Sequence, residues 1–207
     1  MKKLLLAFMV FAASCGFAMA KDYTEGVDYQ KVAPQPTDSG DKVEVLEFFW
    51  YGCPHCYHFE PEINAWKKSI SNNDKVVFKR VPAVFRPEWK VHARTYYALV
   101  KMGKIEKIHG KIFNAIHKEK KHLNTLESMA DFVAVNGVDR KKFVEEYNSF
   151  GIDSLVRKAL KKMKAYNIDG VPMVVINGKY KVSGRMAGSF DNIIKIMNYL
   201  IEKESKQ

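Results

Sequence analysis

The sequence predicts an α/β protein in which a long run of helices interrupts a mixed unit of strands and helices. Two observations predict this class. A strand pattern, a helical pattern and a second strand pattern follow one another early in the chain, which is the order of a βαβ unit with a right-handed crossover. Roughly eighty residues with helical periodicity alone then precede a strand hairpin and a final helix. Such a helical block must pack against the α/β unit, because neither part closes the chain alone.

The early elements are marked by residue type and by breakers. A short strand is predicted near Val27–Val32, followed by a polar loop. The β-branched and aromatic run Val43–Trp50 predicts the next strand, and Lys75–Val81 predicts its partner. Between them, Cys53–Ile70 has a helical pattern in which Pro61 predicts a kink.

The helical block is divided by capping residues and turns. Thr125, Asp139 and Asp153 are N-cap candidates, because their side chains can accept hydrogen bonds from the free N–H groups of a first turn. The helices predicted between residues 87 and 167 cover Lys90–Met102, Ile105–His117, Leu126–Val135, 139–148 and a last stretch beginning at Asp153.

The C-terminal part predicts a hairpin and a helix. Met173–Ile176 and Lys179–Val182 have strand character, and Asn177-Gly178 between them is a hairpin turn signal. Ser189 is expected to cap a final helix with an apolar stripe.

The composition is that of a globular chain. The 207 residues are 47% hydrophobic and 28% charged, which excludes a disordered chain, and 12 Gly with 7 Pro exclude a collagen-like one. The length suffices for a core without disulfide staples. The net charge of +11 is spread over helix faces without interleaved aromatic residues, which disfavours nucleic-acid binding. Attraction to acidic substrates or anionic lipid stays open.

The first twenty residues have the pattern of a secretory signal peptide. Two lysines precede the apolar stretch Leu4–Phe17, and Ala18-Met19-Ala20 is a small-x-small cleavage signal. Cleavage after Ala20 would leave 187 residues, a net charge of +9 and two of the three cysteines. An uncleaved anchor or a lipoprotein site at Cys15 are the alternatives. The lipoprotein site is disfavoured because Ala12 stands where a bulky aliphatic residue is usual.

The two remaining cysteines lie in one tetrapeptide, Cys53-Pro54-His55-Cys56, which follows a strand and opens a helix. Free N–H groups and the helix dipole favour negative charge at such a position, so the pKa of Cys53 should fall. Pro54 suits a first turn, and His55 can add positive charge or a hydrogen bond. We therefore expect Cys53 to be an exposed nucleophile and Cys56 a buried resolving thiol.

Other uses of this cysteine pair fit the sequence less well. A structural zinc site needs four ligands, and neither a second cysteine pair nor His58 completes one. A c-type haem signature requires His directly after the second cysteine, where this chain has Tyr57. A permanently closed structural disulfide is the remaining alternative. Redox chemistry is favoured, because two residues between the cysteines at a helix start are typical of it.

Three segments together resemble the DsbA family of periplasmic dithiol oxidases. They are Leu46-Glu47-Phe48-Phe49, Cys53-Pro54-His55-Cys56-Tyr57 and Val171-Pro172. The resemblance covers essentially the whole mature chain, and the Pro-His dipeptide with Val before Pro172 is its specific mark. It implies a thioredoxin fold, formed by residues 21–86 and 168–207, with an inserted all-helical domain at residues 87–167.

The resemblance also implies how substrate is bound. In this family the proline that matches Pro172 is cis and lies beside the cysteine pair, and the backbone of Val171 is then free to pair with an extended substrate. From the residues alone, a trans proline at the start of a strand is the alternative.

An acid and a base in neighbouring strands are further candidates. Alternation places Val43, Val45, Glu47 and Phe49 on one face of their strand, which makes Glu47 a candidate buried acid. The resemblance implies that Glu47 and Lys79 pair beneath Cys56 and relay its proton. A solvent-facing Glu47 on an edge strand is the alternative.

The function implied is an enzyme that introduces disulfide bonds into exported proteins in the periplasm. The resemblance further implies newly translocated protein thiols as substrates, reoxidation by a DsbB-type membrane quinone reductase, a monomer, and no required metal or cofactor. A disulfide isomerase or reductase of the thioredoxin superfamily and a non-enzymatic chaperone with a structural disulfide are the alternatives.

Overall fold

A computed structural model describes residues 22–206, and within them the chain is organised around one mixed five-stranded sheet. The strand order is β1-β5-β4-β2-β3. The predicted signal peptide lies outside the described residues. The strands are β1 (Gln30–Lys31), β2 (Val43–Phe49), β3 (Val76–Pro82), β4 (Met173–Ile176) and β5 (Tyr180–Ser183).

Strand β2 lies between β3 and β4 and is buried along its whole length. It runs parallel to β3 and antiparallel to β4, and β4 is antiparallel to β5. A strand covered on both faces is expected to be apolar throughout. The two glutamates in β2 are therefore exceptions that need partners.

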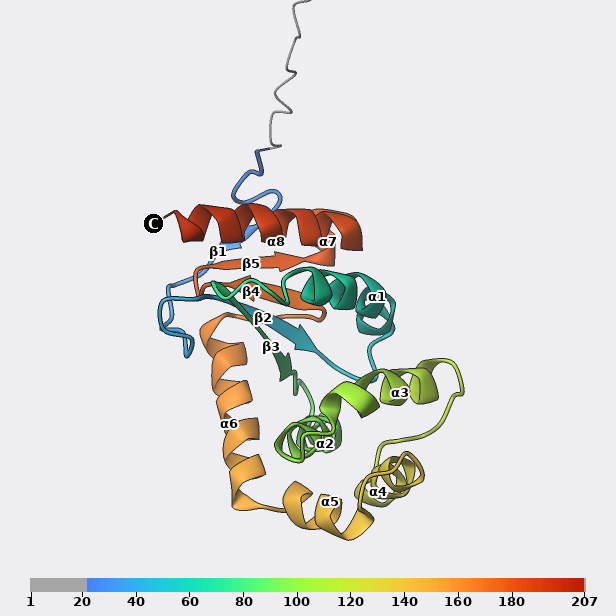
Figure 1. Cartoon of the computed structure of the whole chain (residues 1–207). Helices are drawn as coiled ribbons and strands as arrows, with labels where there is room; N and C mark the ends of the chain where they lie inside the picture. Colours follow the sequence, from blue (N-terminus) through green and yellow to red (C-terminus); the bar gives the residue numbers. More distant parts are fainter. Residues whose placement is uncertain (1–21, 207) are drawn as a thin grey trace, which may run out of the picture.

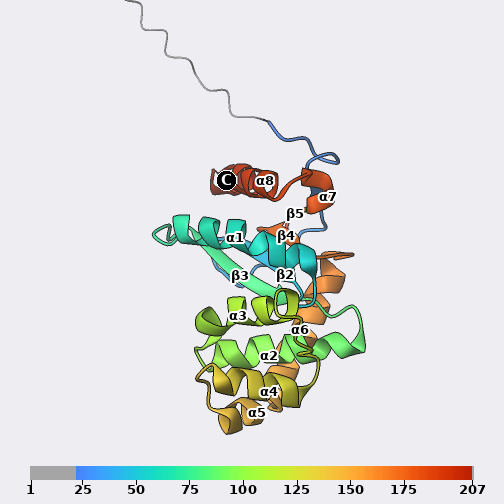
Figure 2. The same ribbon diagram turned by 90° about the vertical axis from the view of Figure 1, so that its right-hand side faces the viewer.

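Helices cover both faces of the sheet (Figures 1 and 2). On one face lie α1 (Pro54–Ser69), the short α7 (Gly184–Ala187) and α8 (Phe190–Ser205). Their apolar side chains, such as Phe59 and Ile196, pack on Val45 and Val174 of the sheet. On the other face, Ala159, Met163 and Tyr166 of the α6 region pack against Leu46 and Phe48.

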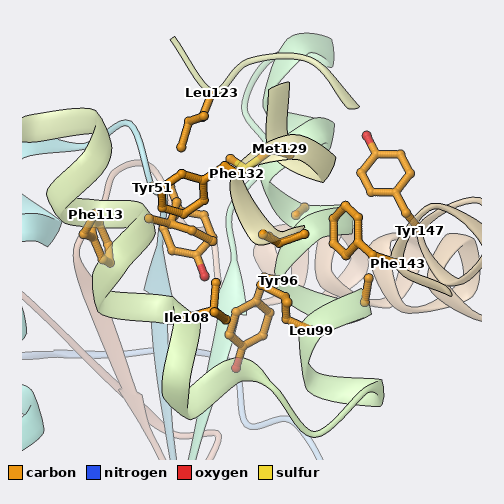
Figure 3. Close-up of a cluster of buried hydrophobic side chains, with 14 of the residues drawn as sticks. Tyr51, Tyr96, Leu99, Ile108, Phe113, Leu123, Met129, Phe132, Phe143 and Tyr147 are labelled. Carbon is orange, nitrogen blue, oxygen red and sulfur yellow. The ribbon is translucent and has the colours of Figure 1, made fainter. Parts of the chain in front are cut away.

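Between β3 and β4 the chain is helical. It forms a 3₁₀ turn, η1 (Pro87–Trp89), and then α2 (Lys90–Lys101), α3 (Ile105–His117), α4 (Leu126–Val135), α5 (Arg140–Tyr147) and α6 (Phe150–Ala165). Their shared core contains Leu99, Phe113, Met129 and Phe143, and Tyr51 enters it from the turn after β2 (Figure 3). Among residues 22–206, no helix is both long and apolar enough to cross a bilayer.

The predicted elements are present, with three differences. Helix α6 begins at Phe150, because the side chain of Ser149 accepts the amide hydrogen bond of Ile152 and caps it. Asp153 therefore lies inside the first turn and not at the cap. Helix α7 was not predicted, because its four residues are too few to show a periodicity. The strand predicted near Val27–Val32 is limited to the two residues of β1.

The predicted Asn177-Gly178 turn joins β4 to β5 with φ values of 49° and 65°. Positive φ at both central residues is the geometry of a type I′ hairpin turn. Gly178 also lies against a neighbouring loop, because a Cβ there would stand 2.3 Å from the carbonyl oxygen of Gln35. This position thus requires glycine for two separate reasons.

We expect Gly178→Ala to lower the free energy of unfolding by roughly 2–3 kcal/mol, since it combines left-handed strain with a backbone clash. Gly103→Ala is the control: its φ is also 65°, but a Cβ there would meet nothing within 4 Å. It should cost about 1 kcal/mol. Urea unfolding of both variants measures the difference, and equal losses would show that the contact with Gln35 carries no cost.

Candidate redox site

The cysteine pair lies where β2 gives way to α1. After Phe49 the chain turns through three residues, and Cys53 occupies the N-cap position of α1 with φ −86° and ψ 116°. Pro54 is the first helical residue, where its missing N–H costs no hydrogen bond. The sulfur of Cys53 accepts a hydrogen bond from the amide of Cys56 at 3.4 Å, so it acts as the capping group.

Both cysteines are free thiols, and both are buried. The expectation of an exposed Cys53 is wrong: its exposed fraction is 7%, and that of Cys56 is 0%. Cys53 is covered because its sulfur folds back over the first turn of α1 and also lies against Val171, to whose carbonyl oxygen the thiol donates at 3.4 Å. Cys53 nevertheless retains the only exposed area of the two sulfur-bearing residues.

The environments of the two thiols shift their pKa values in opposite directions. The hydrogen bond from the Cys56 side chain is the largest influence on Cys53, and with the backbone amides and nearby His55 it outweighs burial. The pKa of Cys53 is lowered to about 6. Burial, first of all, raises the pKa of Cys56 well above its usual value, and the charges of Cys53 and Glu47 add to this. At neutral pH the pair therefore holds one thiolate, on Cys53.

The Val171–Pro172 peptide bond is cis, which confirms the conformation that the family resemblance implied. This bond lies in the loop before β4, and Val171 packs against the core cluster that contains both cysteines. The structure thus brings together residues separated by 118 positions in the chain.

A groove with a volume of about 510 Å³ runs beside this loop. It is bounded by His55 on one side and by the start of α8 on the other, and more of its surface is apolar than polar. Its lining includes His55, Val171, Pro172, Met173, Arg185 and Phe190. A groove of this kind can hold an extended peptide next to the sulfur of Cys53.

Aromatic side chains surround the turn before Cys53, and they differ in exposure. The ring of Trp50 stacks on Trp89 with centroids 3.6 Å apart, and Phe85 packs edge-on against Trp89. Tyr51 and Phe59, in contrast, have no exposed area, because each lies inside a hydrophobic cluster, Tyr51 in that of the helical segment and Phe59 in that between α1, α8 and the sheet. Trp89 and Phe85 come from the segment after β3, and nothing in the sequence linked them to this site.

Tyr57 joins the site to α3. Its ring stacks on His117 with centroids 5.0 Å apart, and its hydroxyl donates to the side chain of Asn114. The Nε2 atom of His117 also contacts the carbonyl oxygen of Tyr51 at 2.8 Å. The first turn of α1 is therefore held against the C-terminal end of α3.

The predicted pairing of Glu47 with Lys79 is wrong. Lys79 lies beside Leu46 in the register of β2 and β3, so it points to the other face of the sheet and binds Glu44 at 2.7 Å. The residue beside Glu47 is Arg80, whose Nε donates to Glu47 Oε2 at 2.7 Å. Neighbouring residues on a strand point to opposite faces of the sheet. The prediction placed Lys79 on the face of Glu47, whereas in the observed register the next residue, Arg80, lies there.

Glu47 is fully buried, as predicted, and its carboxyl is close enough to influence the pKa of Cys56. Burial raises the pKa of Glu47 to about 7, against the opposing charge of Arg80 and with support from the negative charge of Glu60. A carboxyl with this pKa can both accept and release a proton near neutral pH.

Beyond Arg80 the buried polar contacts continue into α1 and α3. Arg80 Nη2 donates to Glu60 Oε1 at 3.1 Å, and the same oxygen lies 3.1 Å from His109 Nε2. The other ring nitrogen of His109 is 2.8 Å from the Tyr51 hydroxyl. His109 was not predicted as a site residue. It lies on the apolar stripe of α3, where a histidine is ordinarily expected to be a packing residue.

The described part of the chain shows no arrangement suited to a metal ion. Among residues 22–206, no group of three or more His, Cys, Asp or Glu side chains is arranged to hold a metal ion. The chemistry that the geometry offers is that of two coupled thiols with a buried carboxyl below them and an apolar groove beside them.

Comparisons with known proteins agree with this geometry. The sequence profile of the DSBA-like thioredoxin domain matches residues 76–191. The thiol:disulfide interchange protein DsbA of Burkholderia cepacia is 44% identical over 98% of this chain and 97% of its own length. The corresponding protein of Pseudomonas aeruginosa is 45% identical over 99% and 97%.

Solved structures of the same family are similar as well. The crystal structure of Pseudomonas aeruginosa DsbA has a TM-score of 0.84 at 46% identity and covers 88% of this chain and 94% of its own. The oxidoreductase NmDsbA1 of Neisseria meningitidis has a TM-score of 0.78 at 29% identity, covering 88% and 94%. The sheet with its covering helices is thus a thioredoxin-like fold. The chain belongs to the DsbA family, the thiol:disulfide oxidoreductases that introduce disulfide bonds into exported proteins.

Proposed function

We propose that Cys53 and Cys56 are the redox pair through which this enzyme donates disulfides. A substrate thiolate attacks the sulfur of Cys53 in the oxidised protein, the Cys53–Cys56 bond breaks, and Cys56 leaves as a thiolate that takes up a proton. A second substrate thiolate then attacks the substrate sulfur of the mixed disulfide, and Cys53 leaves as a thiolate. The substrate loses two electrons to the protein, which ends with both cysteines reduced.

The observation that carries this proposal is the opposite shift of the two thiol pKa values. A thiolate stabilised on Cys53 is a good leaving group in the second step, and it stabilises the reduced protein. The disulfide form is correspondingly a strong oxidant. The raised pKa of Cys56 keeps it protonated, so it does not attack the mixed disulfide before the substrate does.

The other site residues have supporting roles in this proposal. His55 adds positive charge near the Cys53 thiolate, and Pro54 fixes the backbone of the first turn. The backbone of Val171 pairs with an extended substrate, and Pro172 leaves that backbone free of a helix or turn. The thiol of Cys53 touches the Val171 carbonyl oxygen, so a substrate held there would lie next to the attacked sulfur.

We assign the proton transfer at Cys56 to Glu47, with Arg80 as its partner in place of Lys79. When Cys56 leaves as a thiolate, Glu47 supplies its proton. When Cys56 is reoxidised, Glu47 takes the proton up again.

Family membership supports a proposal for the wider setting of this enzyme. Relatives of the DsbA type act on exported protein thiols in the periplasm. We propose that this chain is exported with cleavage after Ala20, works as a monomer, and is reoxidised by a DsbB-type membrane quinone reductase. We also propose that residues 87–167 form a helical domain inserted into a thioredoxin-fold unit of residues 21–86 and 168–207.

A redox titration of the mature protein against glutathione tests the proposed direction of the reaction. The fraction of Cys53–Cys56 disulfide at equilibrium should show a couple far more oxidising than that of thioredoxin. The reason is that the contacts that stabilise the Cys53 thiolate also stabilise the reduced protein. The Cys53→Ser variant should fail to oxidise a reduced, unfolded substrate protein. A thioredoxin-like potential would reassign the enzyme to a reductive role.

The rate of Cys53 alkylation in the reduced protein should rise with pH through a midpoint of about 6. Only the thiolate reacts, so the rate follows ionisation. The Cys53→Ser variant is the control, in which the buried Cys56 should react slowly throughout the neutral range. A midpoint between 8 and 9, near the ordinary value for cysteine, would contradict the proposed stabilisation of the thiolate.

Glu47→Gln should slow reoxidation of the reduced protein by roughly 100-fold at neutral pH, because a positioned acid or base contributes about this much to a rate. Glu44→Gln is the matched control. It lies on the same strand, is equally buried and is also paired with a cation, but it faces away from α1. Stopped-flow measurement of both variants separates proton transfer from the general cost of altering a buried acid, and equal rates in Glu47→Gln and the unaltered protein would exclude the assignment.

A further inference from the structure

A buried polar network connects Glu47 to helix α3 and extends beyond the residues to which a role in thiol exchange has been assigned. It consists of Glu47, Arg80, Glu60, His109 and Tyr51, and every member is at least nine-tenths buried. Burying two acids and one guanidinium is costly unless each group is paired. The cost of burying these charged groups suggests that the network has a function besides packing.

Arg80 is shared between the two acids of the network. Its Nε donates to Glu47 at 2.7 Å, while its Nη2 donates to Glu60 and to Asn64, each at 3.1 Å. Both acids draw on one positive charge. The more negative charge Glu60 carries, the less of the guanidinium's field is available to stabilise the Glu47 carboxylate.

His109 keeps Glu60 ionised. The hydroxyl of Tyr51 lies 2.8 Å from His109 Nδ1, and Glu60 lies 3.1 Å from His109 Nε2. A neutral ring that accepts from Tyr51 at Nδ1 and donates from Nε2 satisfies both contacts. Burial favours this neutral form by lowering the pKa of His109, and although burial also opposes ionisation of Glu60, the hydrogen bond from His109 helps to hold the pKa of Glu60 below its usual value.

We propose that Glu60 and His109 are positioning residues for the thiol chemistry, because together they set how strongly Arg80 stabilises the Glu47 carboxylate. This inference rests on the proposed role of Glu47 in proton transfer. Neither residue touches the sulfur atoms. Their effect reaches Cys56 through the shared guanidinium.

The same cluster borders a cavity on a different side of α1 from the substrate groove. This cavity has a volume of about 660 Å³, and its lining shares no residue with the groove. The charged and titratable groups that face Glu60 there, besides Glu47, come from α1, β3, α2 and α3. They are Lys67, Arg80, Tyr96, Glu106 and His109. The Arg80–Glu60 end of the network thus borders a space that water can enter.

The decisive measurement is the titration of Glu47 itself in the reduced protein. Carbon NMR of glutamate-labelled protein provides it, with the Glu47 signal identified by its absence in Glu47→Gln. In Glu60→Gln the negative charge that opposes ionisation of Glu47 is lost, so the midpoint should fall by roughly one pH unit, a tenfold change in the ratio of its two forms. His109→Leu should shift the midpoint in the same direction, because Glu60 loses its donor and becomes easier to protonate.

Two variants serve as controls. Glu106→Gln removes an equal charge from the same cavity, but Glu106 binds Lys67 at the surface and not Arg80, so the midpoint should move much less than in Glu60→Gln. His109→Gln retains an amide N–H that can donate to Glu60, and it should restore most of the original midpoint. Circular dichroism checks that each variant is folded, and Glu60→Gln alone carries the test if His109→Leu is not.

The outcomes separate this inference from the function on which it rests. An unchanged Glu47 midpoint in folded Glu60→Gln protein would overturn the inference and leave the assignment of Glu47 intact. A shifted midpoint supports it. If that shift leaves the pH dependence of reoxidation unchanged, Glu60 still tunes ionisation of the Glu47 carboxyl, but proton transfer by Glu47 is wrong and the link of Glu60 and His109 to the thiol chemistry falls with it.

Discussion

The sulfur of Cys53 takes the place of a capping oxygen at the start of α1, and the site depends on that contact. The sulfur has two partners, and each suits a different charge state. The amide of Cys56 donates to it and favours the thiolate, while the carbonyl oxygen of Val171 accepts from it and favours the thiol. Ionisation therefore frees the Val171 oxygen at the moment the sulfur becomes charged, and a bound peptide amide can take the vacated position.

Much of this arrangement could be predicted from the sequence, because its signals are local. A β-branched run, a proline in the first turn and two cysteines one turn apart determine the strand, the helix start and the cap with little help from the rest of the chain. The partner of Glu47 could not be predicted in the same way. It depends on the register between β2 and β3, and a shift of one residue exchanges Arg80 for Lys79. His109 and Trp89 were not predicted either, because only the packing of the helical segment on α1 and on the turn before it brings them to the site.

Strand β2 has one glutamate on each face of the sheet, and each glutamate pairs with a cationic side chain of β3. Glu44 meets Lys79 on the α6 face, and Glu47 meets Arg80 on the α1 face. Lys79 remains partly exposed, whereas Arg80 is almost wholly buried and has a second acid to bind. Two pairs that look alike in the sequence therefore differ in electrostatic strength, and the pair beneath Cys56 is the one withdrawn from water.

The two cavities on either side of α1 have a consequence for how the enzyme can turn over. A peptide lying along the Val171–Pro172 loop covers Cys53 and occupies the groove beside His55, but it does not reach the lining of the other cavity. With substrate held in the groove as proposed, the cavity behind the helix stays in contact with water, and the Arg80–Glu60 end of the network borders it. Affinity for the polypeptide and the charge environment of the buried carboxyl can therefore vary independently in this family member.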